Sequence, residues 1–297
     1  MTAPTMKIGG TTFAWGQRTY IMGVINATPD SFSGDGLLAD GDWVERAVAQ
    51  GLAQVRAGAQ LLDVGGESTR PGSEPVPLDE ELRRVLPVVA GLARSVMVPI
   101  SIDTYKAETA RQAVAAGASL INDVWGLRMD PAMGQVVADS RAPVILMHNR
   151  SRPKDAAQSA QLGGRYVGVE YTDLLGDIAR ELLESVELAR QAGVPDERII
   201  LDPGIGFGKT VEQNLELIDR LAELRALGYP VLVGPSRKSF VGYTLNLPPA
   251  QRLEGTAAAV TLAIDRGADI VRVPDVEAMT RVARIADAIV RGRTARG

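Results

Sequence analysis

The chain has 297 residues, 45% of them hydrophobic and 23% charged, and a net charge of −4, which is typical of a globular protein with one large core. Its charges are scattered and it has no cysteine, which excludes extended nucleic acid and membrane partners, a disulfide framework and thiolate chemistry. Because no apolar run reaches the roughly 18 residues of a membrane helix and the start lacks a secretion-signal layout, we expect a cytoplasmic protein.

The first expected element is a short hairpin or plug within residues 1–19, where turn residues surround TTFAWGQ. The apolar run Tyr20–Asn26 predicts a strand that ends in a polar side chain. A helix is expected from residue 43 to 57, because its apolar residues recur every three or four positions, and Gly58 follows as a C-cap would. These elements form the first strand-then-helix unit.

The same alternation of strand and helix returns seven more times. The further strands are predicted at residues 61–67, 98–104, 119–124, 142–148, 199–202, 230–234 and 269–273. The helices that follow them are predicted through residues 82–92, 107–116, 131–138, 171–192, 211–227, 251–266 and 276–290. Eight units in one α/β domain over residues 1–297 favour a (β/α)8 TIM barrel over a doubly wound open sheet. Residues 149–167, polar and mixed in charge, are expected to form an irregular surface insertion.

Residues 201–210, LDPGIGFGKT, show how a buried strand delivers an acid to a site. The apolar run ends in Asp202, and Pro203 with three glycines then frees the loop. One such segment alone also fits a plain strand and tight turn. Its repetition along the chain favours a rim of functional side chains.

In a TIM barrel the active site lies at the carboxyl ends of the strands, so its polar residues can be named from the sequence. Four of them follow four different strands: Asp103, Asn122, Asp202 and Lys238. Carboxylates and an amide oxygen accept hydrogen bonds from ring N–H and amino groups, and a lysine donates to ring oxygen or nitrogen. Together with Met147 and Phe207 as apolar walls, they suit a small polar heterocycle.

A second set on the rim is cationic or donates hydrogen bonds, and suits a phosphate group: Thr69, Arg70, Ser236, Arg237 and Arg272. Asn26 offers a hard oxygen to a magnesium ion that also touches phosphates. His148, the only histidine, is expected to hydrogen-bond or pack, since one histidine cannot build a zinc site. Each residue alone also fits a structural role, such as a helix cap or an ion pair. Their convergence on one rim favours a binding site.

Eight stretches, in order across nearly the whole barrel, resemble the dihydropteroate synthase family, the folate-pathway enzymes that sulfonamides inhibit. They are MGVINATPDSFSGDG (22–36), DVGGESTRPG (63–72), SIDT (101–104), NDV (122–124), MH (147–148), LDPGIGFGK (201–209), GPSRK (234–238) and RVPDV (272–276). The resemblance implies a transferase that joins 6-hydroxymethyl-7,8-dihydropterin pyrophosphate to 4-aminobenzoate. The products would be 7,8-dihydropteroate and pyrophosphate. It also implies a homodimer, for which the last helix, 276–290, is a candidate surface.

The resemblance assigns roles to residues. Those implied to hold the pterin and to be catalytic are Asp103, Asn122, Asp202 and Lys238. Those implied to hold the pyrophosphate with Mg²⁺ are Asn26, as the metal ligand, Thr69, Arg70 and Arg272. Those implied to frame 4-aminobenzoate are Thr69, Pro71, Phe207 and Ser239. The other implied substrate contacts are Met147, Gly234, Ser236 and Arg237, while Asp30 and Phe32 lie on a loop that would close over the site.

One position departs from the family. The family's usual Arg-Val-His-Asp-Val reads RVPDV here, so Pro274 replaces a histidine that would donate to the pyrophosphate. The loss of a hydrogen bond to a charged group costs roughly 1.5–3 kcal/mol, or about tenfold or more in activity. Pro274 therefore leaves open a non-catalytic pterin-binding paralogue. A methyltransferase-type pterin barrel is the other alternative, but it has no need of the phosphate grip formed by Thr69, Arg70, Arg237 and Lys238.

Overall fold

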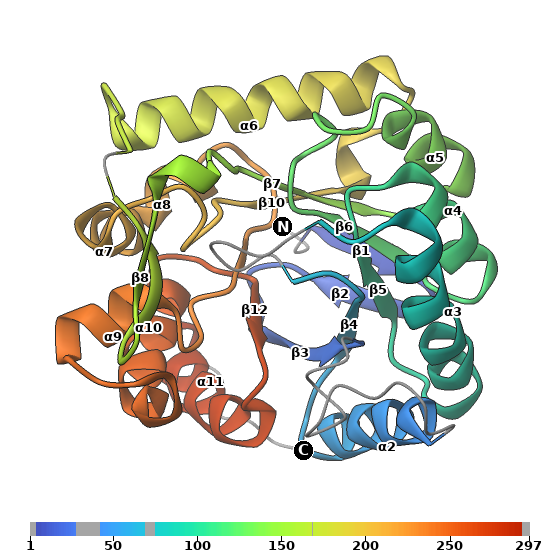
Figure 1. Cartoon of the computed structure of the whole chain (residues 1–297), viewed down its shortest axis with the longest axis horizontal. Coiled ribbons are helices and arrows are strands. Elements are labelled where there is room, and N and C mark those ends of the chain that lie inside the picture. The colour runs from blue at the N-terminus through green and yellow to red at the C-terminus, as the bar shows by residue number, and fades with distance from the viewer. Residues whose placement is uncertain (1–3, 28–41, 69–74, 168, 293–297) are drawn as a thin grey trace.

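A computed structural model describes residues 4–27, 42–68, 75–167 and 169–292, and its centre is a barrel of parallel strands (Figure 1). The strands are β3 (Tyr20–Asn26), β4 (Leu61–Gly65), β5 (Ile100–Asp103), β6 (Leu120–Asp123), β7 (Val144–Met147), β10 (Ile199–Asp202), β11 (Leu232–Val233) and β12 (Ile270–Val273). They are almost entirely buried, as expected of parallel strands that are covered on both faces. All eight lie within predicted strands, and the TIM-barrel prediction is confirmed.

The barrel closes between β10 and β11, which stand at the two ends of the hydrogen-bonded strand order. The hydrogen-bonded order is β10-β7-β6-β5-β4-β3-β12-β11, and every neighbouring pair in it is parallel. A parallel bridge between Leu201 of β10 and Val231, just before β11, joins the two ends, with the Leu201 N–H donating to the Pro230 carbonyl at 2.9 Å. Closure leaves no exposed edge strand in this sheet.

Helices surround the strands as an outer ring (Figure 1). They are α2 (Trp43–Arg56), α3 (Leu78–Ser95), α4 (Ala107–Ala115), α5 (Met133–Ser140), α6 (Leu174–Gln191), α7 (Val211–Asp219), α10 (Leu253–Asp265) and α11 (Val276–Val290). The main hydrophobic core fills the layer between this ring and the barrel, with Val88, Val186 and Ile264 among its fully buried members. Each such side chain contributes about 1.5–3 kcal/mol by leaving water. Within the described residues, no helix has the length and apolar character needed to cross a membrane.

An N-terminal hairpin closes the amino end of the barrel, which confirms the predicted plug. It pairs β1 (Thr5–Ile8) with β2 (Thr11–Ala14), so it begins earlier than the TTFAWGQ stretch around which it was expected. A second apolar cluster joins Phe13 and Trp15 of this plug to residues at the start of barrel strands, among them Leu61 and Ile270. The barrel interior below the mouth is therefore a packed core and not a pore.

Three features differ from the sequence prediction. Residues 149–167 are not irregular: η1 (Pro153–Asp155) leads into an antiparallel hairpin of β8 (Ala156–Ser159) and β9 (Gly163–Tyr166). The helix predicted over residues 211–227 breaks at Arg220, whose ψ of 17° leaves the helical region, and continues as α8 (Leu221–Arg225). An unpredicted short helix, α9 (Ser239–Leu245), directly follows Lys238. Two further 3₁₀ turns, η2 (Asp196–Arg198) and η3 (Pro249–Gln251), precede β10 and α10.

Candidate active site

The strand register places polar residues at one level of the barrel mouth. Along four adjacent strands, Asn26 pairs with Gly65, Gly65 with Asp103, and Asp103 with Asn122. On the next pair, Asp202 lies beside Met147. Because all these residues stand at or near carboxyl ends of parallel strands, the side chains that project inward meet above the packed barrel interior.

Arg272 of β12 crosses the mouth and joins two acids from other strands. Its Nε donates to Asp63 Oδ2 at 2.6 Å and its Nη2 donates to Asp103 Oδ2 at 2.8 Å. Asn122 Nδ2 donates to the same Asp63 oxygen at 3.1 Å. Asp63 is completely buried, so its charge is tolerable only because of this guanidinium and amide. The structure thus places Asp63, to which the sequence analysis assigned no role, at the centre of the network.

Burial and charge act in opposite directions on this network. Burial raises the pKa of Asp103 to about 7, although the positive charge of Arg272 acts to lower it. Burial also acts to lower the pKa of Arg272, but Asp63 and Asp103 outweigh it and hold that pKa above its ordinary value. Arg272 is therefore a permanent cation, whereas Asp103 can change its protonation state near neutral pH.

Two buried acceptor atoms in this network are left without a donor. Among the described residues, neither Asp63 Oδ1 nor Asn122 Oδ1 has a hydrogen-bond partner, although both atoms are shielded from solvent. An unpaired buried acceptor costs about 1–3 kcal/mol. These oxygens are therefore matched to N–H groups that a ligand would bring.

Asp202 and Lys238 form the opposite side of the mouth. Asp202 Oδ1 accepts from the Gly204 N–H at 2.7 Å, and burial raises the pKa of this carboxyl. Lys238 Nζ donates to the Ile205 carbonyl and lies 4.3 Å from the centre of the Phe207 ring. Burial lowers the pKa of Lys238 to about 8, against the attraction of Asp202. The structure thus brings Asp202, Lys238 and Phe207 together, as the sequence predicted.

The loop after β10 needs its glycines for conformation and for space. Gly204, Gly206 and Gly208 all have positive φ, at 70°, 81° and 59°. A Cβ on Gly204 would lie 1.9 Å from the carbonyl oxygen of His148, and one on Gly208 would lie 2.3 Å from the carbonyl carbon of Arg150. The loop therefore packs directly against the chain that leaves β7, and no side chain fits between them.

Lys209 anchors this loop from beneath, a role that the sequence did not reveal. Its Nζ, almost completely buried, lies 2.9 Å from His148 Nδ1 and donates to the carbonyls of Gly204 and Phe207, both at 3.0 Å. His148 Nε2 lies 3.1 Å from Glu181 Oε2. Burial, with the nearby Lys209, lowers the pKa of His148 to about 3, and burial lowers that of Lys209 well below its usual range. His148 is thus a neutral hydrogen-bonding residue, as expected.

The turn Ser236–Lys238 contains one cation that is already paired and one hydroxyl that is not. Arg237 donates through Nε and Nη2 to both carboxylate oxygens of Asp275, at 2.7 and 2.6 Å, so its charge is paired within the protein. Ser236 Oγ is shielded from solvent and has no partner among the described residues. Ser239 begins α9. In this turn the hydroxyl of Ser236 is thus unsatisfied among the described residues, whereas the guanidinium of Arg237 is already paired.

The remaining predicted residues lie as follows. Met147 is buried at the end of β7, Gly234 directly follows β11, and Asn26 is exposed at the end of β3. Pro274 is exposed just after β12. Five predicted residues fall outside the described part of the chain: Asp30, Phe32, Thr69, Arg70 and Pro71. In the described part, no group of three or more His, Cys, Asp or Glu side chains could hold a metal ion.

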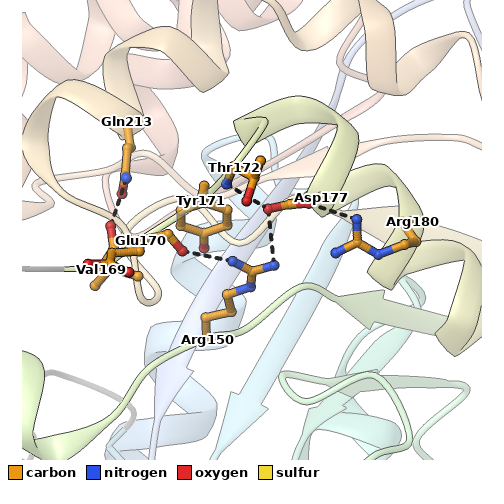
Figure 2. Close-up of a pocket in the computed structure, with 8 residues that line it drawn as sticks. All are labelled: Arg150, Val169, Glu170, Tyr171, Thr172, Asp177, Arg180 and Gln213. Atoms are coloured by element: carbon orange, nitrogen blue, oxygen red, sulfur yellow. Dashed lines mark hydrogen bonds and ion pairs between the residues drawn. The ribbon is translucent and has the colours of Figure 1, made fainter.

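A surface cavity of about 840 Å³ lies outside this set of residues. Figure 2 shows that its polar groups face one another: the Arg150 guanidinium donates to the Glu170 carbonyl at 2.9 Å and lies 3.4 Å from the Asp177 carboxylate. It also lies 4.2 Å from the centre of the Tyr171 ring. The cavity is connected to the glycine loop through Tyr171, whose hydroxyl donates to the Gly208 carbonyl at 2.9 Å. None of the predicted site residues lines it.

Comparison with known proteins places this geometry in a family. The profile of a family described as "Pterin binding enzyme" matches residues 22–274. A dihydropteroate synthase of Synechocystis sp. is 47% identical over 289 residues, which cover 97% of this chain and 96% of the relative. A Xanthomonas albilineans dihydropteroate synthase solved with 4-aminobenzoic acid has 43% identity and a TM-score of 0.86, covering 97% and 98% of the two chains. The Yersinia pestis enzyme, solved in a sulfonamide drug complex, has 39% identity and a TM-score of 0.87, covering 97% and 100%.

Proposed function

The chain belongs to the dihydropteroate synthase family of pterin-binding enzymes, and on this premise we propose the reaction that it performs. It condenses 6-hydroxymethyl-7,8-dihydropterin pyrophosphate with 4-aminobenzoate to give 7,8-dihydropteroate and pyrophosphate, a step of folate biosynthesis. The observation that carries this proposal is the polar mouth of the barrel, where Asn122 Oδ1 and Asp63 Oδ1 are buried acceptors that await donors. The test is formation of 7,8-dihydropteroate, identified by mass, from the two substrates.

The pterin ring is the part of the substrate that the polar side chains at the barrel mouth recognise. The ring presents N–H and amino donors on one edge and a carbonyl acceptor beside them. Asn122 and Asp202 accept from the donors, and Lys238, held beside the Phe207 ring, donates to an acceptor. The network is preorganised, because Arg272 and Asn122 already fix Asp63 and Asp103 before substrate arrives.

The reaction needs charge stabilisation more than acid–base chemistry. When the C–O bond to the pyrophosphate breaks, its electron pair leaves with the pyrophosphate, and the methylene carbon attached to the ring becomes cationic. The Asp103 carboxylate stabilises this cation, and the Arg272 guanidinium stabilises the leaving anion. The amine nitrogen of 4-aminobenzoate then bonds to the methylene carbon and releases a proton. No covalent intermediate with the protein is required.

Magnesium belongs to this proposal as a partner of the pyrophosphate. Mg²⁺ keeps several waters and is usually held by one or two protein oxygens together with substrate phosphates. The exposed Asn26 at the end of β3, with no acidic cluster among the described residues around it, fits that mode of binding. Bound there, Mg²⁺ would supply positive charge to the phosphate oxygens. Ser236 Oγ, buried without a partner in the described structure, would donate to the same anion.

We further propose that the protein forms a homodimer through its last two helices. Large apolar side chains are exposed on the two last helices: Leu262 of α10 and Ile285, Ile289 and Val290 of α11. α10 and α11 pack side by side, so these residues support a homodimer through that face. Ile285→Glu should then give a monomer in sedimentation experiments.

By likeness to the Yersinia pestis enzyme, a sulfonamide should compete with 4-aminobenzoate. Cytoplasmic localisation stays a prediction.

The alternatives are weaker on the same observations. A methyltransferase-type barrel is not favoured, because relatives that match nearly the whole chain are dihydropteroate synthases. The alternative of a non-catalytic paralogue depends on Pro274 alone. That residue is exposed, and the Arg272 two positions before it keeps both of its carboxylate partners.

A further inference from the structure

Arg252, just before α10, is a buried arginine that bonds backbone carbonyls from three separate segments. Only 2% of the surface of Arg252 is exposed to solvent. Its Nη1 donates to the Arg237 carbonyl at 2.9 Å, its Nε to the Leu247 carbonyl at 3.0 Å, and its Nη2 to the Leu162 carbonyl at 2.8 Å. A longer contact of 3.4 Å reaches the Lys238 carbonyl. No carboxylate of the described chain forms an ion pair with it.

The first of these segments is the turn that presents Lys238. Arg237 has a φ of 53°, in the left-handed region that non-glycine residues seldom adopt. Three contacts hold it there: its N–H donates to Thr256 Oγ1 at 3.0 Å, its guanidinium binds Asp275, and its carbonyl accepts from Arg252. Such a conformation persists only when the surrounding structure over-determines it. Of the three contacts, the one from Arg252 acts nearest to Lys238, because the Arg237 carbonyl belongs to the peptide bond that joins Arg237 to Lys238.

The second segment is the tip of the β8–β9 hairpin, within the insertion that the sequence predicted to be irregular. Besides the Leu162 carbonyl on Arg252, the Tyr243 hydroxyl of α9 donates to the Gly163 carbonyl at 3.2 Å. The Arg165 guanidinium also lies 4.3 Å from the centre of the Tyr243 ring. The hairpin is therefore attached to α9, the helix that begins immediately after Lys238, at several points.

Space for the guanidinium comes from a glycine. A Cβ on Gly242 of α9 would lie 2.1 Å from Arg252 Cζ, far inside van der Waals contact. Glycine inside a helix costs roughly 0.5–1 kcal/mol relative to alanine, so the arginine is accommodated at the expense of helix stability. Only arginine has a planar fork of five donors that can reach carbonyls in several directions at once. Lysine, as a point charge on a flexible stem, could satisfy fewer of them.

We propose that Arg252 is a positioning residue for the condensation: it holds the Ser236–Lys238 turn and the β8–β9 hairpin in one fixed arrangement, and so sets the place of Lys238. This inference rests on the proposed function for its catalytic consequence. Its structural content, the coupling of turn and hairpin through one guanidinium, does not depend on that function.

Hydrogen exchange of the full-length protein without substrate tests the coupling itself. Arg252→Gln keeps a polar side chain but removes the fork and the charge, and Gly242→Ala displaces the guanidinium while leaving the arginine in place. Both variants should increase exchange about tenfold or more in residues 156–166 and 235–245, since a hydrogen bond to a charged group is lost at each segment. Arg291→Gln is the matched control, because Arg291 also donates to a backbone carbonyl, that of Ala268, which lies outside both of these segments. Unchanged exchange in both segments would overturn the proposal.

Turnover tests the catalytic consequence. Arg252→Gln should lower kcat/KM for the pterin pyrophosphate about 10- to 100-fold, as expected from misplacement of a contact group, and Arg252→Lys should restore part of it. In a Lys238→Met background the same change should have little further effect, because the two residues act through one contact. Losses that add fully would contradict a positioning role. Absence of turnover in the unmodified protein would count against the proposed function, while the exchange result would still decide the coupling.

Discussion

Arg272 donates to Asp63 at 2.6 Å although 209 residues separate them in the chain, and this contact ties the last barrel strand to the second one in sequence. The same guanidinium reaches Asp103, so one cation balances two acids in a site where burial disfavours charge. The mouth of the barrel is therefore organised before any ligand binds.

Asp103 and Lys238 are expected to be required for turnover but not for folding. Asp103→Asn removes the negative charge that stabilises the pterin methylene cation, and Lys238→Met removes a donor to the ring. Each should lower kcat/KM by at least about 100-fold, the scale of a lost electrostatic contact in a transition state. Thermal unfolding and steady-state kinetics check this, with the exposed Asp79→Asn as a control that should behave like the wild type. Wild-type turnover by both folded variants would refute the site.

The pH dependence of kcat/KM should report Asp103 and Lys238. The pKa of Asp103 is raised to about 7 by burial, so activity should rise with pH through that value as the carboxylate forms. Activity should fall again as pH rises through about 8, the lowered pKa of Lys238, because the ammonium is lost.

Arg272→Gln gives this profile a sharper test. Loss of the positive charge beside Asp103 should raise the pKa of Asp103 further, which moves the acidic limb to higher pH. Arg272→Lys is the matched control, since it keeps the charge and should leave the limb near its original place. An acidic limb that does not move in Arg272→Gln would show that another group titrates.

Much of this site could be predicted because a TIM barrel brings strand ends together whatever the loops do. Asp103, Asn122 and Asp202 follow buried apolar runs, which predicts that they share one rim, and the register places the first two side by side. The β8–β9 hairpin was not predictable, since its polar strands lack the alternation that marks a strand. Likewise, the seven residues of α9 are too few to show helical periodicity.

The missed residues depend on contacts that are distant in the chain. A lysine in a glycine-rich loop would ordinarily be assigned to solvent, yet Lys209 is buried because His148, 61 residues earlier, lies beneath it. In the same way, the ion pair of Arg237 with Asp275, 38 residues further on, could not be predicted from the sequence. The sequence pattern identifies residues at the same rim of the barrel, but it does not show which of their charges neutralise one another.

Lys209→Met should loosen the glycine loop without emptying the space beneath it. The substitution removes the Lys209 donor from the carbonyls of Gly204 and Phe207, although the Gly204 carbonyl still accepts from the Phe207 N–H at 3.0 Å, and should lower the free energy of unfolding by about 1–3 kcal/mol. Because Phe207 lies beside Lys238, the KM for the pterin pyrophosphate should rise as well. Urea denaturation and kinetics measure both effects, against exposed Lys154→Met as control. Unchanged stability would mean that Lys209 does not anchor the loop.

Pro274→His should increase activity if the missing imidazole matters. Proline offers neither a ring donor nor a backbone N–H, whereas histidine would restore a donor facing the leaving pyrophosphate. We expect kcat/KM to rise about tenfold, and Pro274→Ala, which restores the N–H but not the imidazole, to rise less. Equal rates for the three proteins would show that other donors, such as Ser236, already fill the role.

The proposed reaction is tested most directly by pyrophosphate release from the purified protein, given the pterin pyrophosphate, Mg²⁺ and varied 4-aminobenzoate. We predict release that depends on the amine, is competed by a sulfonamide and is lost in Asp103→Asn. Tight pterin binding in the same preparation with no amine-dependent release would contradict the proposal, because the pocket would then be retained without its reaction.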